Sequence, residues 1–98
     1  MSSMRKLMKQ AQEVQERLQS ELNAMVVEVS VGGGMVSVKM SGHKQLVGCK
    51  IDPEAMDPSD PSMLEDLIVA AVNEAASRIE ETRQKKMGSM AASMPGLF

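Results

Sequence analysis

The sequence predicts an α+β domain of element order α-β-β-β-α, in which a three-stranded antiparallel meander is flanked by two long helices. Three stretches of periodicity predict it. Apolar residues recur with a helical period over residues 4–23 and again over residues 61–87, and they alternate with a period of two over residues 25–51. The chain has 98 residues, which is the size of one domain, and its single aromatic residue, Phe98, implies a thin core.

The first predicted helix carries a narrow apolar seam from Met4 to about Asn23. The members of the seam are mostly three or four positions apart: Met4, Leu7, Met8, Ala11, Val14, Leu18, Leu22 and Met25. Gln, Glu, Lys and Arg dominate the other positions, and Ser2 or Ser3 can serve as the N-cap. A seam this narrow is typical of a helix that packs on another helix.

Two glycine-containing turns set the register of the three predicted strands. If Gly33-Gly34 is a two-residue hairpin loop, three apolar pairs form: Val31 with Val36, Val29 with Val38, and Val27 with Met40. If Gly42-His43 is the second such loop, Val38 faces Val47 and Val36 faces Cys49. Both turns place the apolar residues on one face of the sheet. Cys49 is therefore predicted to be a buried strand residue.

The second helix is predicted to begin at Pro61 or Ser62, at the end of an acidic, proline-rich loop over residues 52–61. Asp60 is its expected N-cap and Pro61 its first residue, because proline suits the first turn of a helix. The helix is expected to run to about Met87. We therefore divide the chain into a single domain at residues 1–87 and a flexible Met/Gly/Pro tail at residues 88–98.

The second predicted helix is too apolar to be covered by one small sheet. Between Leu67 and Ala76 only Asn73 and Glu74 are polar. One stripe can lie on the sheet: Leu64, Leu67, Ile68, Ala71, Ala75 and Ile79. Val69, Val72 and Ala76 then point elsewhere. We expect a symmetric homodimer with Leu67, Val69, Val72 and Ala76 in its interface. The alternative is a monomer whose first helix packs over the second.

The residue types needed for catalysis are scarce. The chain has one His, one Cys and no Tyr or Trp. His43 is expected to be a turn residue and Cys49 a small hydrophobe. The acids of residues 52–60 lack the spacing of a calcium loop, and Gly32-Gly33-Gly34 precedes a strand rather than a helix, which disfavours a phosphate-binding loop. The sequence therefore predicts no enzyme, no metal, no cofactor and no small-molecule substrate.

The apolar runs are too short for a secretory signal or a membrane span, which predicts a cytoplasmic protein that does not insert into a membrane.

The basic residues gather at the outer ends of the two predicted helices. The net charge is −2, but residues 1–9 and 82–98 each carry three basic residues and no acid, while residues 10–81 hold five basic residues and all thirteen acids. The six terminal cations are Arg5, Lys6, Lys9, Arg83, Lys85 and Lys86. The helix dipole explains cations at a helix C-terminus but not at an N-terminus. Contact with the phosphate backbone of a nucleic acid would stabilise the cations at both places.

Several stretches of the sequence occur in the order of a known family. They are MRKLMKQAQEVQERLQ (Met4–Gln19), the glycine-rich hairpin, KIDPEAMD (Lys50–Asp57), MLEDLIVAAVNEAASRIEETRQKKM (Met63–Met87) and the Met/Gly/Pro tail. The most specific pieces are LMKQAQ, IDP and LEDLIVAAVNEA. With these stretches the chain resembles the YbaB/EbfC family of bacterial nucleoid-associated proteins over nearly its whole length.

The resemblance implies an intertwined, tweezer-like homodimer with protruding helices. It also implies binding to double-stranded DNA in the nucleoid, with a role in nucleoid organisation and gene regulation. The six terminal cations are our own candidates for DNA contacts, and they predict phosphate binding with little sequence preference. The alternative is a homodimeric protein-interaction adaptor without direct DNA binding, which the acidic middle of the chain and the Met-rich tail favour.

Overall fold

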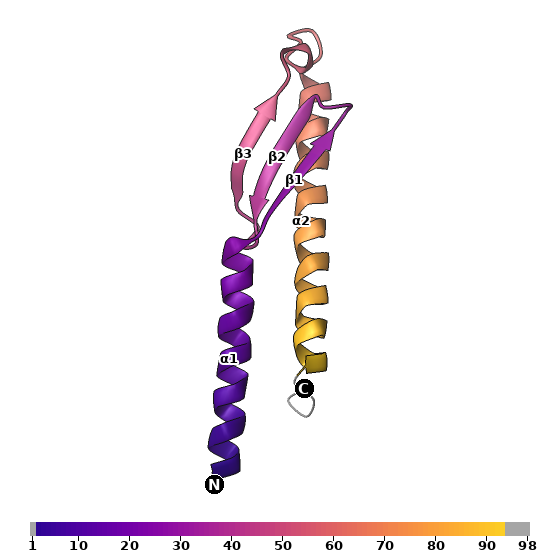
Figure 1. Cartoon of the computed structure of the whole chain (residues 1–98). Helices are drawn as coiled ribbons and strands as arrows, with labels where there is room; N and C mark the ends of the chain where they lie inside the picture. Colours follow the sequence, from indigo (N-terminus) through magenta and orange to yellow (C-terminus); the bar gives the residue numbers. More distant parts are fainter. Residues whose placement is uncertain (1, 94–98) are drawn as a thin grey trace.

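Two long helices and a three-stranded sheet make up the computed structural model, which describes residues 2–93. The elements are, in chain order, α1 (Ser2–Ala24), β1 (Val26–Val31), β2 (Val36–Ser41), β3 (Leu46–Ile51), the short 3₁₀ helix η1 (Pro53–Ala55) and α2 (Pro61–Ser93). The chain forms a rod with extents of 69 × 18 × 16 Å (Figure 1). The predicted α-β-β-β-α order is confirmed.

The β1–β2 hairpin has the predicted register. Val31 pairs with Val36, Val29 with Val38 and Val27 with Met40. The turn between the strands contains Gly32, Gly33 and Gly34, and all three have positive φ angles, between 63° and 94°. This backbone conformation is readily available only to glycine, so the glycine run itself permits the turn.

The predicted register of the β2–β3 hairpin is wrong by two residues. Val38 pairs with Cys49, and Val36 pairs with Ile51. The Ser41 N–H donates to the Gln45 carbonyl oxygen at 2.8 Å, which closes a three-residue loop whose last residue, Lys44, has a φ of 61°. Three-residue hairpin loops commonly end in this left-handed conformation.

A second irregularity restores the apolar face of β3. The register shifts between Lys39, which pairs with Gly48, and Met40, which pairs with Leu46, so that Val47 is an extra residue. The longer loop and this bulge each shift the register by one residue. The total shift is two residues, and side chains alternate with a period of two along a strand. Cys49 and Leu46 therefore lie on the same face of the sheet as their partners on β2.

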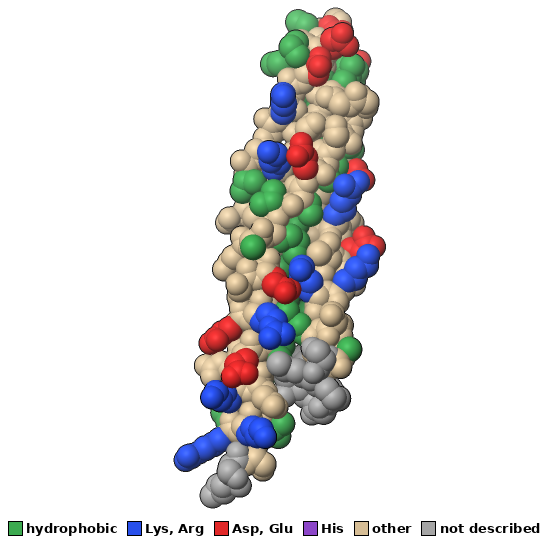
Figure 2. Space-filling model, viewed as in Figure 1, with side chains coloured by type: hydrophobic (Ala, Val, Ile, Leu, Met, Phe, Trp, Pro, Cys, Tyr) green, Lys and Arg blue, Asp and Glu red, His purple; other side chains and the backbone are tan. Residues whose placement is uncertain are grey.

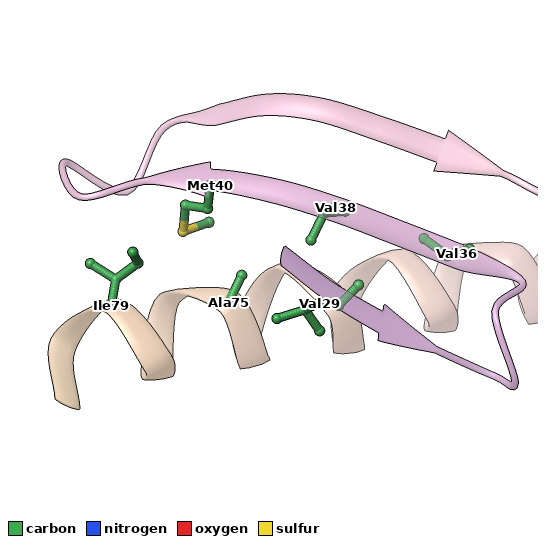
Figure 3. Close-up of a cluster of buried hydrophobic side chains, with 7 residues drawn as sticks. Val29, Val36, Val38, Met40, Ala75 and Ile79 are labelled. Atoms are coloured by element: carbon green, nitrogen blue, oxygen red, sulfur yellow. The ribbon is translucent and has the colours of Figure 1, made fainter. Parts of the chain in front are cut away.

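The core lies between α2 and the inner face of β1 and β2. The buried residues are Val29, Val36, Val38, Met40, Ala71, Ala75 and Ile79 (Figure 3). The predicted stripe of α2 is thereby confirmed, with Leu64, Leu67 and Ile68 partly buried against it. Alanines on α2 bring the helix close to the bulkier valines of the sheet.

β3 is largely uncovered, because α2 lies over β1 and β2. α2 packs mainly against β1 and β2 (Figure 1). Leu46 is consequently 49% exposed although it faces inward, and Cys49 is exposed as well. The prediction that Cys49 is buried is wrong because strand alternation gives the face of a residue but not whether a helix lies over that face.

α1 joins the sheet through Met25 and lies alongside the C-terminal half of α2 (Figure 1). At this junction the Gly42 N–H donates to the Met25 carbonyl oxygen at 3.0 Å. A Cβ atom at Gly42 would lie 2.2 Å from the carbonyl oxygen of Leu22. The end of α1 therefore rests directly on the β2–β3 turn, and glycine is required there because of this close approach.

α2 begins as predicted and ends later than predicted. The Asp60 carboxylate accepts hydrogen bonds from the Met63 N–H at 3.3 Å and the Ser62 hydroxyl at 3.0 Å, and Pro61 is the first helical residue. The helix end expected at about Met87 is wrong, because the helix continues through Gly88 to Ser93. Met90 is buried within this extension. Residues 94–98 of the predicted tail lie outside the described residues.

Candidate nucleic-acid interface

The two basic segments of the sequence lie at different levels of the rod: residues 5–9 are near the free end of α1, and residues 83–86 lie beside the end of α1 that joins the sheet. α1 and α2 run antiparallel, so the N-terminus of α1 and the C-terminus of α2 both lie below the sheet in Figure 1. The predicted DNA-binding residues thereby fall into two groups on neighbouring helices. We call Arg5, Lys6 and Lys9 the α1 cations, and Arg83, Lys85 and Lys86 the α2 cations. Figure 2 shows Lys and Arg side chains on this lower part of the surface, with Asp and Glu side chains among them.

The α1 cations are exposed and form no ion pair with any described residue. All three project from the first two turns of α1, where the helix dipole is positive. Acids are absent from the first turn of this helix. The local field therefore repels cations, and a phosphate group is the kind of ligand that would relieve this repulsion.

The α2 cations are held by carboxylates instead. Arg83 lies 3.6 Å from Glu80, and Lys85 lies 3.9 Å from Glu81. Lys86 reaches across to α1, where its Nζ atom lies 3.3 Å from a carboxylate oxygen of Glu21. Among the described residues, this last contact is the ion pair that joins the two helices.

The partners of the α2 cations were missed by the sequence reasoning, although part of the signal was present. Glu80 and Glu81 stand three and four positions before their cations, which is the spacing of neighbours on one face of a helix. Glu21 is 65 positions away from Lys86 in the chain, and no local spacing could have paired them.

A further ion pair supports the junction between the sheet and α2. Lys44, in the β2–β3 turn, lies 2.9 Å from Glu80. The Lys44 ammonium group donates a hydrogen bond to the Glu80 carboxylate. This hydrogen bond and the positive charge of Lys44 hold the pKa of Glu80 below its usual value, and the charge of Arg83 acts in the same direction. His43 of the same turn forms a hydrogen bond with the side chain of Asn23 at the end of α1. His43 is thus a turn residue, as predicted.

The opposite end of the rod is acidic. Residues 52–66 contain six acids and no basic residue, and Figure 2 shows carboxylates at the upper end. The Ser59 hydroxyl and N–H donate to the Asp57 carboxylate at 2.7 and 2.9 Å, and these hydrogen bonds lower the pKa of Asp57. The acids of this upper end would repel a polyanion such as DNA.

The four predicted interface residues have different surroundings. Val69 is 58% exposed and points away from the sheet, as expected. Leu67, Val72 and Ala76 pack at the margin of the core. The expectation that Val72 and Ala76 face away from the sheet is therefore wrong, because the stripe that α2 presents to β1 and β2 is wider than one row of residues.

Apolar side chains are also exposed on α1 and β3. Met4 and Met8, on the N-terminal turns of α1, are 67% and 68% exposed, whereas Val14 and Leu22 of the same seam are buried. In β3, Leu46 and Val47 are exposed. Apolar surface of this kind in a protein with a small core is typical of chains that associate.

Neither a metal centre nor a membrane span is present in the part of the chain that the structure describes. His, Cys, Asp and Glu side chains at residues 2–93 form no group of three or more that could hold a metal ion. The same residues include no helix of the length and hydrophobicity that crossing a bilayer requires.

Comparison with known proteins provides a family and a fold. The model of the YbaB/EbfC DNA-binding family matches residues 1–94. A nucleoid-associated protein of Alkaliphilus metalliredigens is 46% identical over 101 residues, covering 98% of this chain and 89% of the relative. One of Acidobacterium capsulatum is 47% identical over 104 residues, covering 97% of this chain and 95% of the relative.

The fold also matches a solved structure. An uncharacterized protein of Helicobacter pylori, known from its crystal structure, superposes with a TM-score of 0.80 at 24% sequence identity. The match covers 92% of this chain and 95% of that one. At this level of identity the likeness concerns the fold alone.

Proposed function

This chain belongs to the YbaB/EbfC DNA-binding family, and from that membership we propose that it is a nucleoid-associated protein that binds the phosphate backbone of double-stranded DNA. Binding takes place along the part of the rod formed by α1 and α2, through the α1 cations near the free end of α1 and the α2 cations closer to the sheet. It is largely independent of sequence and contributes to nucleoid organisation and gene regulation. The protein acts in the cytoplasm, on the nucleoid.

The single observation that carries the proposal is the group of three exposed α1 cations near the free end of α1, with the α2 cations on the neighbouring helix closer to the sheet. The three α1 cations form no ion pair with a described residue, so they contact phosphate without first breaking an internal pair. The chain has no Tyr or Trp for stacking on bases. Lys and Arg on a helix end contact phosphates, which position a protein on DNA without reading its sequence.

We further propose that the DNA-binding form is a tweezer-like homodimer. Val69 on α2 is exposed and apolar, and Leu67, Val72 and Ala76 lie beside it at the margin of the core. The inward face of β3 is uncovered by its own helix. A second copy of the chain that covers these surfaces would place two basic ends on one duplex, which raises the effective affinity.

A DNA titration at two salt concentrations tests the main proposal. Fluorescence anisotropy on two unrelated duplexes of equal length is expected to give similar affinities at low salt. The logarithm of the affinity is expected to fall with the logarithm of the salt concentration by about 0.9 for each phosphate neutralised. Absence of binding at low salt would contradict the proposal and favour the protein-interaction alternative. A large difference between the duplexes would contradict the lack of sequence preference.

Sedimentation equilibrium tests the dimer. The mass of one chain is 10.6 kDa, and twice that mass is expected at micromolar concentration. Val69→Glu is expected to shift the equilibrium toward the single chain, because it places a charge in the proposed interface. The matched control is Ser77→Glu, which adds the same charge at another exposed position of α2. A monomer mass for the unmodified protein would refute the dimer.

A further inference from the structure

A small depression lies between α1 and α2, in the C-terminal third of each helix. Its volume is about 200 Å³, and it is lined by Arg17, Glu21, Lys86, Ser89 and Met90. Arg17 and Glu21 are one helical turn apart on α1, and Lys86 and Ser89 are three residues apart on α2. Both spacings place the pairs on one helix face, so four polar groups from two helices line the same hollow.

The depression has the residue types of an anion-binding site, and the Glu21 carboxylate supplies an anion to it. Two of its side chains are cations, and Ser89 adds a hydroxyl donor. The Glu21 carboxylate lies 3.3 Å from the Lys86 ammonium group and supplies the negative charge. A carboxylate and a phosphodiester each carry one negative charge on oxygen atoms and accept the same hydrogen bonds. Glu21 therefore holds Lys86 by the same kind of charged contact that a phosphate oxygen would make.

We propose that this depression is a phosphate site, formed by Arg17, Lys86 and Ser89, at which the Glu21 carboxylate competes with the phosphate of bound DNA. The inference rests on the proposed DNA-binding function and extends it to Arg17 and Ser89. Arg17 supplies a planar fork suited to two phosphate oxygens, and Lys86 supplies a point charge. Glu21 limits the affinity, because Lys86 must leave its internal pair before it contacts DNA.

The competing pair also joins the two helices, so its release has a mechanical consequence. Lys86 and Glu21 connect α1 to α2 across the depression. Phosphate binding to Lys86 removes that connection, while the packing of Val14 and Leu22 continues to hold α1 beside α2. Phosphate binding at this site would therefore remove the ion pair between the two helices and leave their apolar packing in place.

Removal of the Glu21 charge tests the competition. Glu21→Gln is expected to tighten DNA binding about 1.4- to 5-fold, which corresponds to the ~0.2–1 kcal/mol typical of an exposed ion pair. The salt dependence is expected to steepen by about 0.9, one additional phosphate contact. The matched control is Glu16→Gln, an exposed acid of the same helix that lines a different part of the surface.

Glu16 makes the control stringent because it lies closer along α1 to the α1 cations than Glu21 does. A general change in net charge would therefore raise affinity at least as much in Glu16→Gln as in Glu21→Gln. An equal gain in the two variants would overturn the inference. Persistence of the Glu21→Gln gain when Arg17→Gln and Lys86→Gln are also present would overturn it as well.

Inorganic phosphate separates failure of this inference from failure of the proposed function. If the unmodified protein binds no duplex, the DNA-binding proposal fails. Titration of the Glu21→Gln chain with phosphate, followed by NMR at the Ser89 amide, then decides the inference by itself. Saturation at lower phosphate concentration than in Glu16→Gln supports the site, and identical titrations of the two variants contradict it.

Discussion

The two cation groups are predicted to contribute unequally to DNA binding. Neutralising the α1 cations with three Lys or Arg→Gln substitutions is expected to weaken binding more than the same treatment of the α2 cations. The α1 cations form no ion pair within the described residues, whereas the α2 cations lie 3.3 to 3.9 Å from carboxylates. An α2 cation must break its pair before it contacts phosphate, and this cost reduces its net contribution.

The expected difference in affinity follows from the three ion pairs of the α2 cations. Exposed ion pairs are typically worth ~0.2–1 kcal/mol each, so three of them cost about 0.6–3 kcal/mol in total. At about 1.4 kcal/mol per tenfold change, the loss of affinity is expected to be roughly 3- to 150-fold greater for the α1 variant than for the α2 variant. The α1 variant should also lose about 2.7 in salt dependence for each chain bound.

Anisotropy titrations over a range of salt concentrations measure both quantities. The control is Lys39→Gln with Lys50→Gln, which removes positive charge from the sheet instead of from the two cation groups. This control is expected to change the affinity little. The reasoning is refuted if neutralising the α2 cations costs as much as neutralising the α1 cations, or if the sheet control has the effect of either.

Three further predictions concern the fold. Gly42→Ala is expected to lower the free energy of unfolding by about 1–3 kcal/mol in urea denaturation, because the new methyl group would overlap the Leu22 carbonyl oxygen; an unchanged midpoint would contradict the close approach. Ile79→Ala is expected to cost about 2–5 kcal/mol in the same assay, since the side chain is fully buried, and a loss below that range would mean that the neighbouring side chains fill the cavity. The pair of Lys44 with Glu80 lowers the pKa of the carboxyl in the folded state, so its stabilisation is present above the usual pKa of Glu and is lost as the pH falls through the lower folded value. Glu80→Gln is accordingly expected to flatten the decrease of the urea midpoint between pH 7 and pH 3, and an identical decrease in both proteins would count against the pair.

The sequence identifies the cations of the candidate site, but it does not show which of them are held in ion pairs. The clustering of six cations near the ends of the helices is visible in the chain, as is the identity of each one. Their ion pairing is only half visible. Glu80 and Glu81 are neighbours of their partners by helical spacing, whereas Glu21 meets Lys86 only because α1 and α2 lie side by side.

The errors about the sheet have a related cause. The Gly42-His43 loop was predicted from the preference of glycine for tight turns, but Gly42 also has to accommodate the backbone of Leu22. The loop is one residue longer, and a bulge at Val47 compensates for it. Alternation along β3 correctly indicated the inward face of Cys49. The side chain is exposed because α2 is only wide enough to cover two strands.

The sequence by itself determined the order of the elements, the register of the first hairpin, the apolar stripe of α2 and the identity of the cations. These features depend on periodicity, turn residues and charge, which are local properties of the chain. Only the tertiary structure decided that the α2 cations lie beside the C-terminal end of α1, that β3 is uncovered, and that Glu21 holds Lys86. Each of these depends on where α1 and α2 lie relative to the sheet and to one another, and contacts between residues far apart in the chain set that arrangement.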